Sequence, residues 1–190
     1  MHLLFLAPGY PDEMPLFVRG LARAGATIWG LSDVPAHDLP ALTRHHLSGY
    51  LQASIRDEAQ TTERVRQWVG SPGGPPRLDR VVALWEPAVL LAARIREALG
   101  VEGMGVEQAR LFRDKELMKT AVEAAGLRVP RHARARTAQE VREAAERIGY
   151  PLIVKPIDGA GSMDTFRVDD AAELEQALGR LTHIAEVNVE

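Results

Sequence analysis

Short apolar runs alternate with segments of helical spacing in the first part of the chain. Residues 2–7 form an apolar run that ends at a Pro-Gly turn, and residues 27–31 form a second run. Between them, residues 16–24 carry apolar side chains at helical spacing, and Gly25 suits the end of a helix. A strand–helix–strand unit of this kind predicts a parallel sheet.

The same alternation continues to about residue 105. A polar helix is expected over residues 57–69, a buried strand over 81–85, and an alanine-rich helix over 88–99 that Gly100 closes. We therefore predict an open parallel-sheet α/β domain over residues 1–105. The glycine fingerprint of dinucleotide-binding domains is absent after the first strand, which argues against a dinucleotide cofactor.

The pattern from residue 106 onward predicts an α+β unit over residues 106–190. Asp114 suits the start of a helix, and the Thr137-x-x-Glu140 pair forms a capping-box pattern ahead of another. Residues 131–136, 152–154, 165–168 and 184–190 are expected to be strands, and residues 170–179 a helix.

Composition narrows the classes of ligand and compartment. Hydrophobic residues make up 46% of the chain, enough to fill a core, and the net charge is -3, which argues against nucleic acid as the main ligand. The chain has no cysteine, so a thiolate metal site and a cysteine nucleophile are excluded. No export signal or membrane span is evident, and we expect a cytoplasmic protein.

The strongest chemical feature is a lysine at the end of a buried strand, followed by a loop of small residues. Lys155 ends the apolar run 152–154, and Asp158-Gly159-Ala160-Gly161-Ser162 follow. Such a loop lets backbone N–H groups approach a phosphate chain, and the ammonium adds a positive charge. A plain hairpin turn with a solvated lysine is the alternative.

Lysine is rare in this chain, which uses arginine as its usual cation. There are 20 arginines and three lysines, Lys115, Lys119 and Lys155. A compact ammonium on a flexible stem suits contact with phosphate. Lys115 follows Asp114 at the start of a helix that ends in Ala-Gly-Leu-Arg-Val-Pro.

The two features together resemble the ATP-grasp superfamily. The order is Asp-Lys at a helix start, then a Tyr-Pro-Leu-Ile-Val-Lys-Pro strand, then the glycine loop, and it covers roughly residues 80–190. The resemblance implies that Lys115, Lys155 and the loop residues Asp158, Gly159, Ala160, Gly161 and Ser162 contact ATP phosphates. It also implies that residues 1–105 form a Rossmann-like pre-ATP-grasp domain, and that residues 106–190 form the first α+β subdomain of an ATP-grasp fold, truncated before its metal-binding half. Glu190 would then begin the hinge beside the adenine, and the Mg²⁺ ligands would lie outside this chain.

The resemblance further implies a ligase that activates a carboxylate as an acyl phosphate for attack by an amine. The expected partners are therefore a small-molecule carboxylate and an amine, with no nucleic acid or membrane. This chain alone would be inactive. The alternative is a non-catalytic nucleotide-binding or interaction module. A weaker alternative is a nucleotide-sugar or dinucleotide enzyme built on the N-terminal α/β domain.

Three local features bear on these hypotheses. Asp164 departs from the family pattern, because a carboxylate beside a triphosphate must point away or bind a metal ion. Glu186-Val187-Asn188 spells a Glu-x-Asn metal motif, which we reject because it follows the glycine loop too closely. Residues 184–190 are expected to present an exposed strand edge that could pair two copies into a homo-oligomer.

Overall fold

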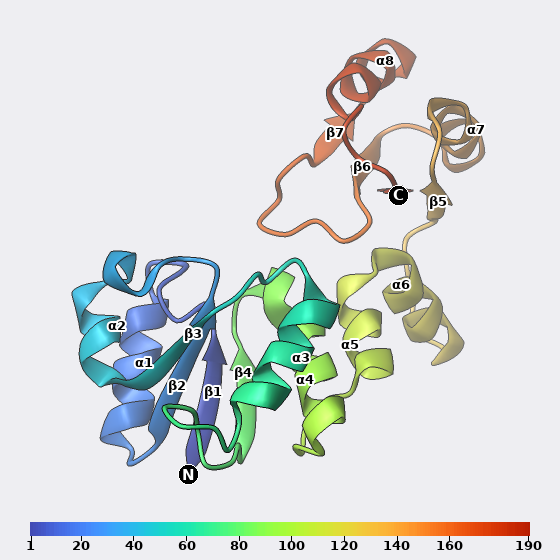
Figure 1. Ribbon diagram of the computed structural model, residues 1–190. Helices are drawn as coiled ribbons and strands as arrows, with labels where there is room; N and C mark the ends of the chain where they lie inside the picture. Colours follow the sequence, from blue (N-terminus) through green and yellow to red (C-terminus); the bar gives the residue numbers. More distant parts are fainter. The chain divides into compact units, whose positions relative to one another are not determined.

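The computed structural model describes residues 1–190, which form two compact units (Figure 1). Unit 1 comprises Met1–Ala109 and unit 2 comprises Arg110–Glu190. The expected succession of an open parallel sheet and an α+β unit is confirmed.

Unit 1 contains a four-stranded parallel sheet in the order β3-β2-β1-β4. Its strands are β1 (His2–Leu6), β2 (Thr27–Ser32), β3 (Leu47–Gln52) and β4 (Arg80–Ala83). Its helices are α1 (Met14–Arg23), η1 (Ala36–Asp38), α2 (Ala41–His46), α3 (Glu58–Trp68), η2 (Glu86–Ala88) and α4 (Val89–Leu99). Helix α5 (Val106–Arg113) spans the boundary between the units.

Both faces of the central strand β1 are buried. Leu4 and Leu6 belong to one apolar cluster with Leu91 and Ile95 of α4. Leu3 and Phe5 belong to another, with Met14 and Val18 of α1. Successive side chains of a strand point to opposite faces, so a strand covered on both sides is apolar throughout. This burial explains why residues 2–6 lack alternating polarity.

The sequence did not predict β3 or α2. Strand β3 lies at the edge of the sheet and is only half-buried, and its sequence Leu-Ser-Gly-Tyr-Leu-Gln has no sustained apolar run. Helix α2 has six residues, too few for a helical period to become evident. His45 and His46 end this helix.

Unit 2 contains a four-stranded antiparallel sheet in the order β5-β8-β6-β7. Its strands are β5 (Ala133–Ala135), β6 (Leu152–Pro156), β7 (Phe166–Val168) and β8 (Val187–Val189). Its helices are α6 (Lys115–Ala124), α7 (Ala138–Ile148) and α8 (Ala171–Arg180). Residues of α7 and α8 form one apolar cluster with the strands.

The prediction that residues 184–190 form an exposed strand edge is wrong. Strand β8 lies inside the sheet and pairs with β5 on one side and β6 on the other. Val187, Asn188 and Val189 are all buried. The sequence could not reveal this, because β5, which comes some 50 residues earlier, supplies the second partner.

Polar residues fix the helix starts as expected. The Asp114 carboxylate caps α6 by accepting from the backbone N–H groups of Glu116 and Leu117. Thr137 and Glu140 form a complete capping box at α7. A membrane crossing would require a longer and more apolar helix than any that the chain forms.

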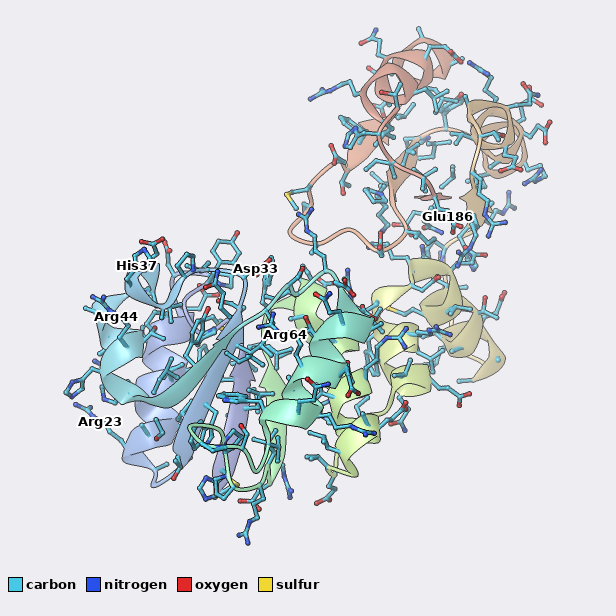
Figure 2. All side chains as sticks on the ribbon, in the orientation of Figure 1. Arg23, Asp33, His37, Arg44, Arg64 and Glu186 are labelled. Carbon is cyan, nitrogen blue, oxygen red and sulfur yellow. The ribbon has the colours of Figure 1, made fainter.

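Arginine supplies the cations on the helices of unit 1, where the sequence contains no lysine. Arg23, Arg44 and Arg64 are exposed on α1, α2 and α3 (Figure 2). All three lysines therefore lie in unit 2.

Replacing Gly49 by alanine should destabilise unit 1. An added Cβ would lie 2.5 Å from Cζ3 of Trp29, whose indole ring is buried. Overpacking of this kind costs about 1–3 kcal/mol of unfolding free energy. Chemical denaturation followed by tryptophan fluorescence measures the change.

Gly20→Ala is the matched control for that substitution. Gly20 lies inside α1, and nothing lies within 4 Å of an added Cβ. Alanine should therefore stabilise the helix by about 0.5–1 kcal/mol. Equal effects of the two substitutions would contradict the assigned close approach of Gly49 to Trp29.

Candidate functional site

Two lysines of unit 2 share one carboxylate. Glu190 follows β8, and its Oε1 pairs with Nζ of Lys155, which lies on the neighbouring strand β6. Its Oε2 pairs with Nζ of Lys119 on α6. The Lys119 side chain is only 9% exposed, so its ammonium depends on this partner.

Strand pairing places Glu190 at this position. Backbone N–H of Glu190 donates to the Ile153 carbonyl over 2.9 Å, and Ile153 N–H donates back over 2.6 Å. The reciprocal bonds continue the β6–β8 ladder beyond Val189 and hold the carboxylate beside Lys155. Burial alone would raise the pKa of the Glu190 carboxyl, but the ammonium groups of Lys119 and Lys155 outweigh burial and hold the pKa below its ordinary value.

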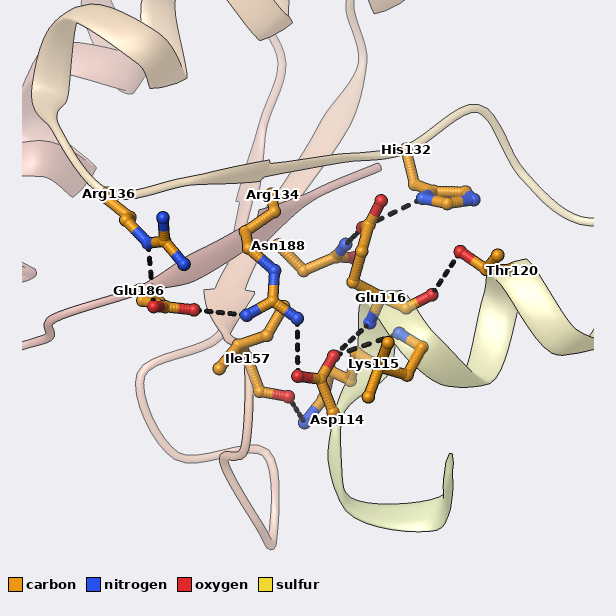
Figure 3. A network of polar contacts seen from close by, with 11 residues as sticks. Asp114, Lys115, Glu116, Thr120, His132, Arg134, Arg136, Ile157, Glu186 and Asn188 are labelled. Carbon is orange, nitrogen blue, oxygen red and sulfur yellow. Dashed lines mark hydrogen bonds and ion pairs between the residues drawn. The ribbon is translucent and has the colours of Figure 1, made fainter. Parts of the chain in front are cut away.

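Asn188 extends this cluster toward the start of α6. Its side chain is fully buried, and its Oδ1 accepts from Nζ of Lys119. Its Nδ2 donates to Oε2 of Glu116 over 3.0 Å, and Nδ1 of His132 lies 3.0 Å from the same oxygen (Figure 3). The buried amide is thus satisfied at both ends, which fixes its orientation.

A second set of ion pairs joins α6 to strands β5 and β8. Arg134 donates to the carboxylates of Asp114 and Glu186, and Glu186 also accepts from Nε of Arg136 over 2.8 Å (Figure 3). The bond from Arg136 is the main reason that the pKa of Glu186 is lowered, and the bond from Arg134 adds to it. These pairs fix the start of α6 against the sheet.

The start of α6 also holds the base of the glycine loop. Nζ of Lys115 donates to the carbonyls of Ile157, over 3.3 Å, and Gly159, over 2.9 Å. The Arg113 guanidinium donates to the carbonyl of Asp158 between them. Two cations therefore bind three successive carbonyls where β6 enters the loop.

The loop itself turns through left-handed backbone. Gly161 has φ 63° and Ser162 has φ 59°. An added Cβ at Gly161 would meet no atom within 4 Å, so open space faces the loop at that residue. Asp164, which departs from the family pattern, has its carboxylate 3.2 Å from Nε2 of His183.

The structure thus brings the predicted residues together in two groups. Lys115 lies at the base of the loop that contains Asp158, Gly159, Ala160, Gly161 and Ser162, and Lys155 pairs with Glu190. Sequence reasoning missed Lys119, Asn188 and Glu116. Lys119 had a usable signal, because it is one of three lysines and lies one helical turn after Lys115.

No metal site accompanies these residues. The chain contains no group of three or more His, Asp or Glu side chains that could hold a metal ion. Glu186 is bound to two arginines, and Asn188 to Lys119 and Glu116.

Glu190→Gln should destabilise unit 2, because it leaves two ammonium groups without their shared counter-ion. Breaking a buried pair costs about 3 kcal/mol or more. Hydrogen exchange of peptides from residues 110–190 measures the loss, because all three tryptophans lie in unit 1. Glu175→Gln, which removes the exposed Arg142 pair on α7 and α8, is the control and should change protection little.

The contribution of Glu190 should depend on pH. Its pKa in the folded chain is lower than its ordinary 4.5, so the stabilisation is complete above that value and disappears as pH falls through the folded pKa. Unit 2 of the unmodified chain should therefore lose more stability between pH 6 and pH 3 than unit 2 of Glu190→Gln. Parallel pH profiles for the two proteins would contradict the assigned ion pairs.

Comparison with protein families supports a common origin for unit 2. Residues 114–189 match the family model described as carbamoyl-phosphate synthase L chain, ATP binding domain. Among curated proteins, the N-terminal section of the carbamoyl phosphate synthase large chain of Aquifex aeolicus is 34% identical over 128 residues. That alignment covers 65% of this chain and 22% of the Aquifex protein.

Solved structures share the whole fold. An L-amino acid ligase from Bacillus licheniformis superposes with a TM-score of 0.76 and is 25% identical, covering 99% of this chain and 43% of the ligase. An N5-carboxyaminoimidazole ribonucleotide synthetase, solved as its ADP complex, also gives a TM-score of 0.76, at 17% identity, covering 100% of this chain and 46% of the synthetase. At that identity the likeness concerns the fold alone.

The chain spans less than half the length of each of these relatives. Its match nevertheless runs from the Asp114 cap to Val189, and so includes all three lysines and the glycine loop. Residues 114–189 are therefore similar to the ATP-binding domain of ATP-grasp ligases, and the chain as a whole is similar in fold to part of such enzymes.

Proposed function

We propose that unit 2 supplies the first part of the ATP site of a ligase that activates a carboxylate as an acyl phosphate for attack by an amine. One observation carries the proposal: a series of contacts connects the residues that the family pattern singles out. Lys115 binds the loop after Lys155, Lys155 pairs with Glu190, and Glu190 pairs with Lys119, one turn along the helix from Lys115.

The charge of these residues and the shape of the adjoining loop suit a polyphosphate. Lys115 and Lys119 on α6 and Lys155 on β6 contribute three ammonium groups to these contacts, and Arg113 adds a guanidinium. The adjoining loop has small side chains and open space at Gly161. Backbone N–H groups and ammonium groups arranged in this way hold phosphate oxygens and stabilise charge that develops during transfer.

ATP would supply the phosphoryl group. The residues of this chain have other tasks: Lys155 and Lys115 neutralise phosphate oxygens, and the 159–162 loop covers them. Glu190 holds the two lysines beside it, and its position after β8 suits a hinge next to the adenine. The donors of a Mg²⁺ site would come from outside residues 1–190.

The proposed partners are a small-molecule carboxylate and an amine, in keeping with a relative that is an L-amino acid ligase. A non-catalytic nucleotide-binding module would use the same contacts. An assay of ADP formation distinguishes the two hypotheses. A ligase forms ADP only when both a carboxylate and an amine are present, whereas a non-catalytic module binds nucleotide without forming ADP. The complete gene product is the protein for that assay.

Lys155→Ala should weaken binding of ATP more than binding of adenosine. Loss of a hydrogen bond to a charged group costs about 1.5–3 kcal/mol, or roughly 10- to 100-fold in affinity. Calorimetric titration of the chain with ATP, AMP and adenosine measures the series, and the loss should grow with the number of phosphates. Lys115→Ala should likewise lower the affinity for ATP more than the affinity for adenosine.

Arg142→Ala is the matched control, because its guanidinium lies on α7 and pairs with Glu175 on the exposed side of the unit. It should leave all three affinities unchanged. An equal loss for ATP and adenosine in Lys155→Ala would overturn the assignment of these residues to an ATP site.

A further inference from the structure

A cavity of about 460 Å³ lies in unit 1, outside the residues discussed above. Its walls come from the carboxyl ends of all four strands: Ala7 follows β1, Asp33 follows β2, Ile55 lies beyond β3, and Trp85 follows β4. The volume is within the range of small-molecule sites.

The sheet topology makes this a favourable position. Strand β1 has β2 on one side and β4 on the other, so the chain changes direction across the sheet between β1 and β4. Connections leave such a point in opposite directions, and open α/β sheets bind ligands in the crevice that results. Tyr10 and Trp85 approach from the two sides of this point, with ring centroids 5.1 Å apart and ring planes at 84°.

Hydrogen bonds hold the cavity walls in place. The Tyr50 hydroxyl lies 2.6 Å from Oγ of the buried Ser32 and also donates to the Val34 carbonyl. Nε2 of Gln52 donates to the Asp33 carbonyl over 3.0 Å. The segment that carries Asp33 and Val34 is therefore tied to strand β3 and preformed.

The opposite wall is equally constrained. Oγ1 of the buried Thr43 donates to the Pro8 carbonyl over 3.0 Å. An added Cβ at Gly9 would lie 2.8 Å from Cδ of Pro40, so Gly9 allows a close approach between the turn after β1 and the start of α2. The cavity is a built feature of the fold.

The lining chemistry selects a cation with an apolar body. The only charged side chains among the lining residues are the carboxylates of Asp33 and Asp38, and no lysine or arginine is present. The remaining surface is largely apolar and includes Val34, Leu39 and Ile55. Aromatic faces such as those of Tyr10 and Trp85 also attract cations. A phosphate or carboxylate would meet like charge.

Asp33 is the better partner for a ligand cation. Asp38 already lies 3.5 Å from Nε2 of His37. Asp33 and His37 lie at the same end of unit 1 (Figure 2), and Asp33 is exposed. Its backbone is fixed while its carboxylate remains accessible.

We propose that this cavity binds a small organic amine, with the ammonium beside Asp33 and the apolar body against Val34, Ile55 and Trp85. The inference goes beyond the proposed ATP site, because every lining residue belongs to unit 1. It holds or fails independently of nucleotide binding.

The test titrates the chain without nucleotide, using three probes of similar shape: 2-phenylethylamine, 2-phenylethanol and 3-phenylpropionate. Amide and indole NMR shifts locate binding, and calorimetry gives the affinities. The amine should shift the signals of Ala7, Asp33 and Trp85 and bind at least about tenfold more tightly than the alcohol. The acid should bind most weakly.

Variants separate the charge of Asp33 from the shape of the cavity. Asp33→Asn should lower the affinity for the amine about tenfold and leave that for the alcohol unchanged. Val34→Lys, at an exposed lining position, should abolish amine binding and admit the acid. Asp169→Asn in unit 2 is the control and should change neither.

Equal affinities for amine and alcohol, an unchanged amine affinity in Asp33→Asn, absence of binding, or shifts confined to residues outside the lining would each overturn the proposal. Circular dichroism of each variant confirms that unit 1 remains folded, so that a lost affinity refers to the cavity.

Discussion

The packing of unit 2 depends on one constraint: the buried ammonium group of Lys119 needs a negatively charged partner. Lys119 is the buried residue of α6, and an unpaired ammonium at such a position would cost several kcal/mol. Glu190 and Asn188 meet this need, and both come from the β8 region at the far end of the sequence of unit 2. The helix is therefore docked on the sheet largely through polar groups, which fix its register more sharply than apolar packing would.

The same polar contacts connect fold and site. Asp114 caps α6, and through Arg134 it also binds the strand region that carries Glu186. Lys115, the next residue, reaches the carbonyls at the base of the glycine loop. A contact that stabilises a helix terminus thus also places a cation at the base of the loop.

Sequence patterns predicted the structural features that depend on residues close together in the chain. The Asp114 cap, the Thr137–Glu140 capping box and the strand that ends at Lys155 all depend on neighbouring residues, and all were found. The interior position of β8 and the pairing of Lys119 with Glu190 depend on residues 50 to 70 positions apart. No local pattern encodes such contacts, and β3 was missed because an edge strand needs little apolar character.

The uneven distribution of lysine makes this protein suitable for selective labelling of its primary amines. Apart from the chain's own amino terminus, every primary amine lies in unit 2, and each is engaged: Lys119 and Lys155 with Glu190, and Lys115 with loop carbonyls. An amine-reactive reagent would therefore modify almost nothing else. The rate at which it labels each lysine becomes a direct record of how often these contacts open in solution, without any probe being introduced into the sequence.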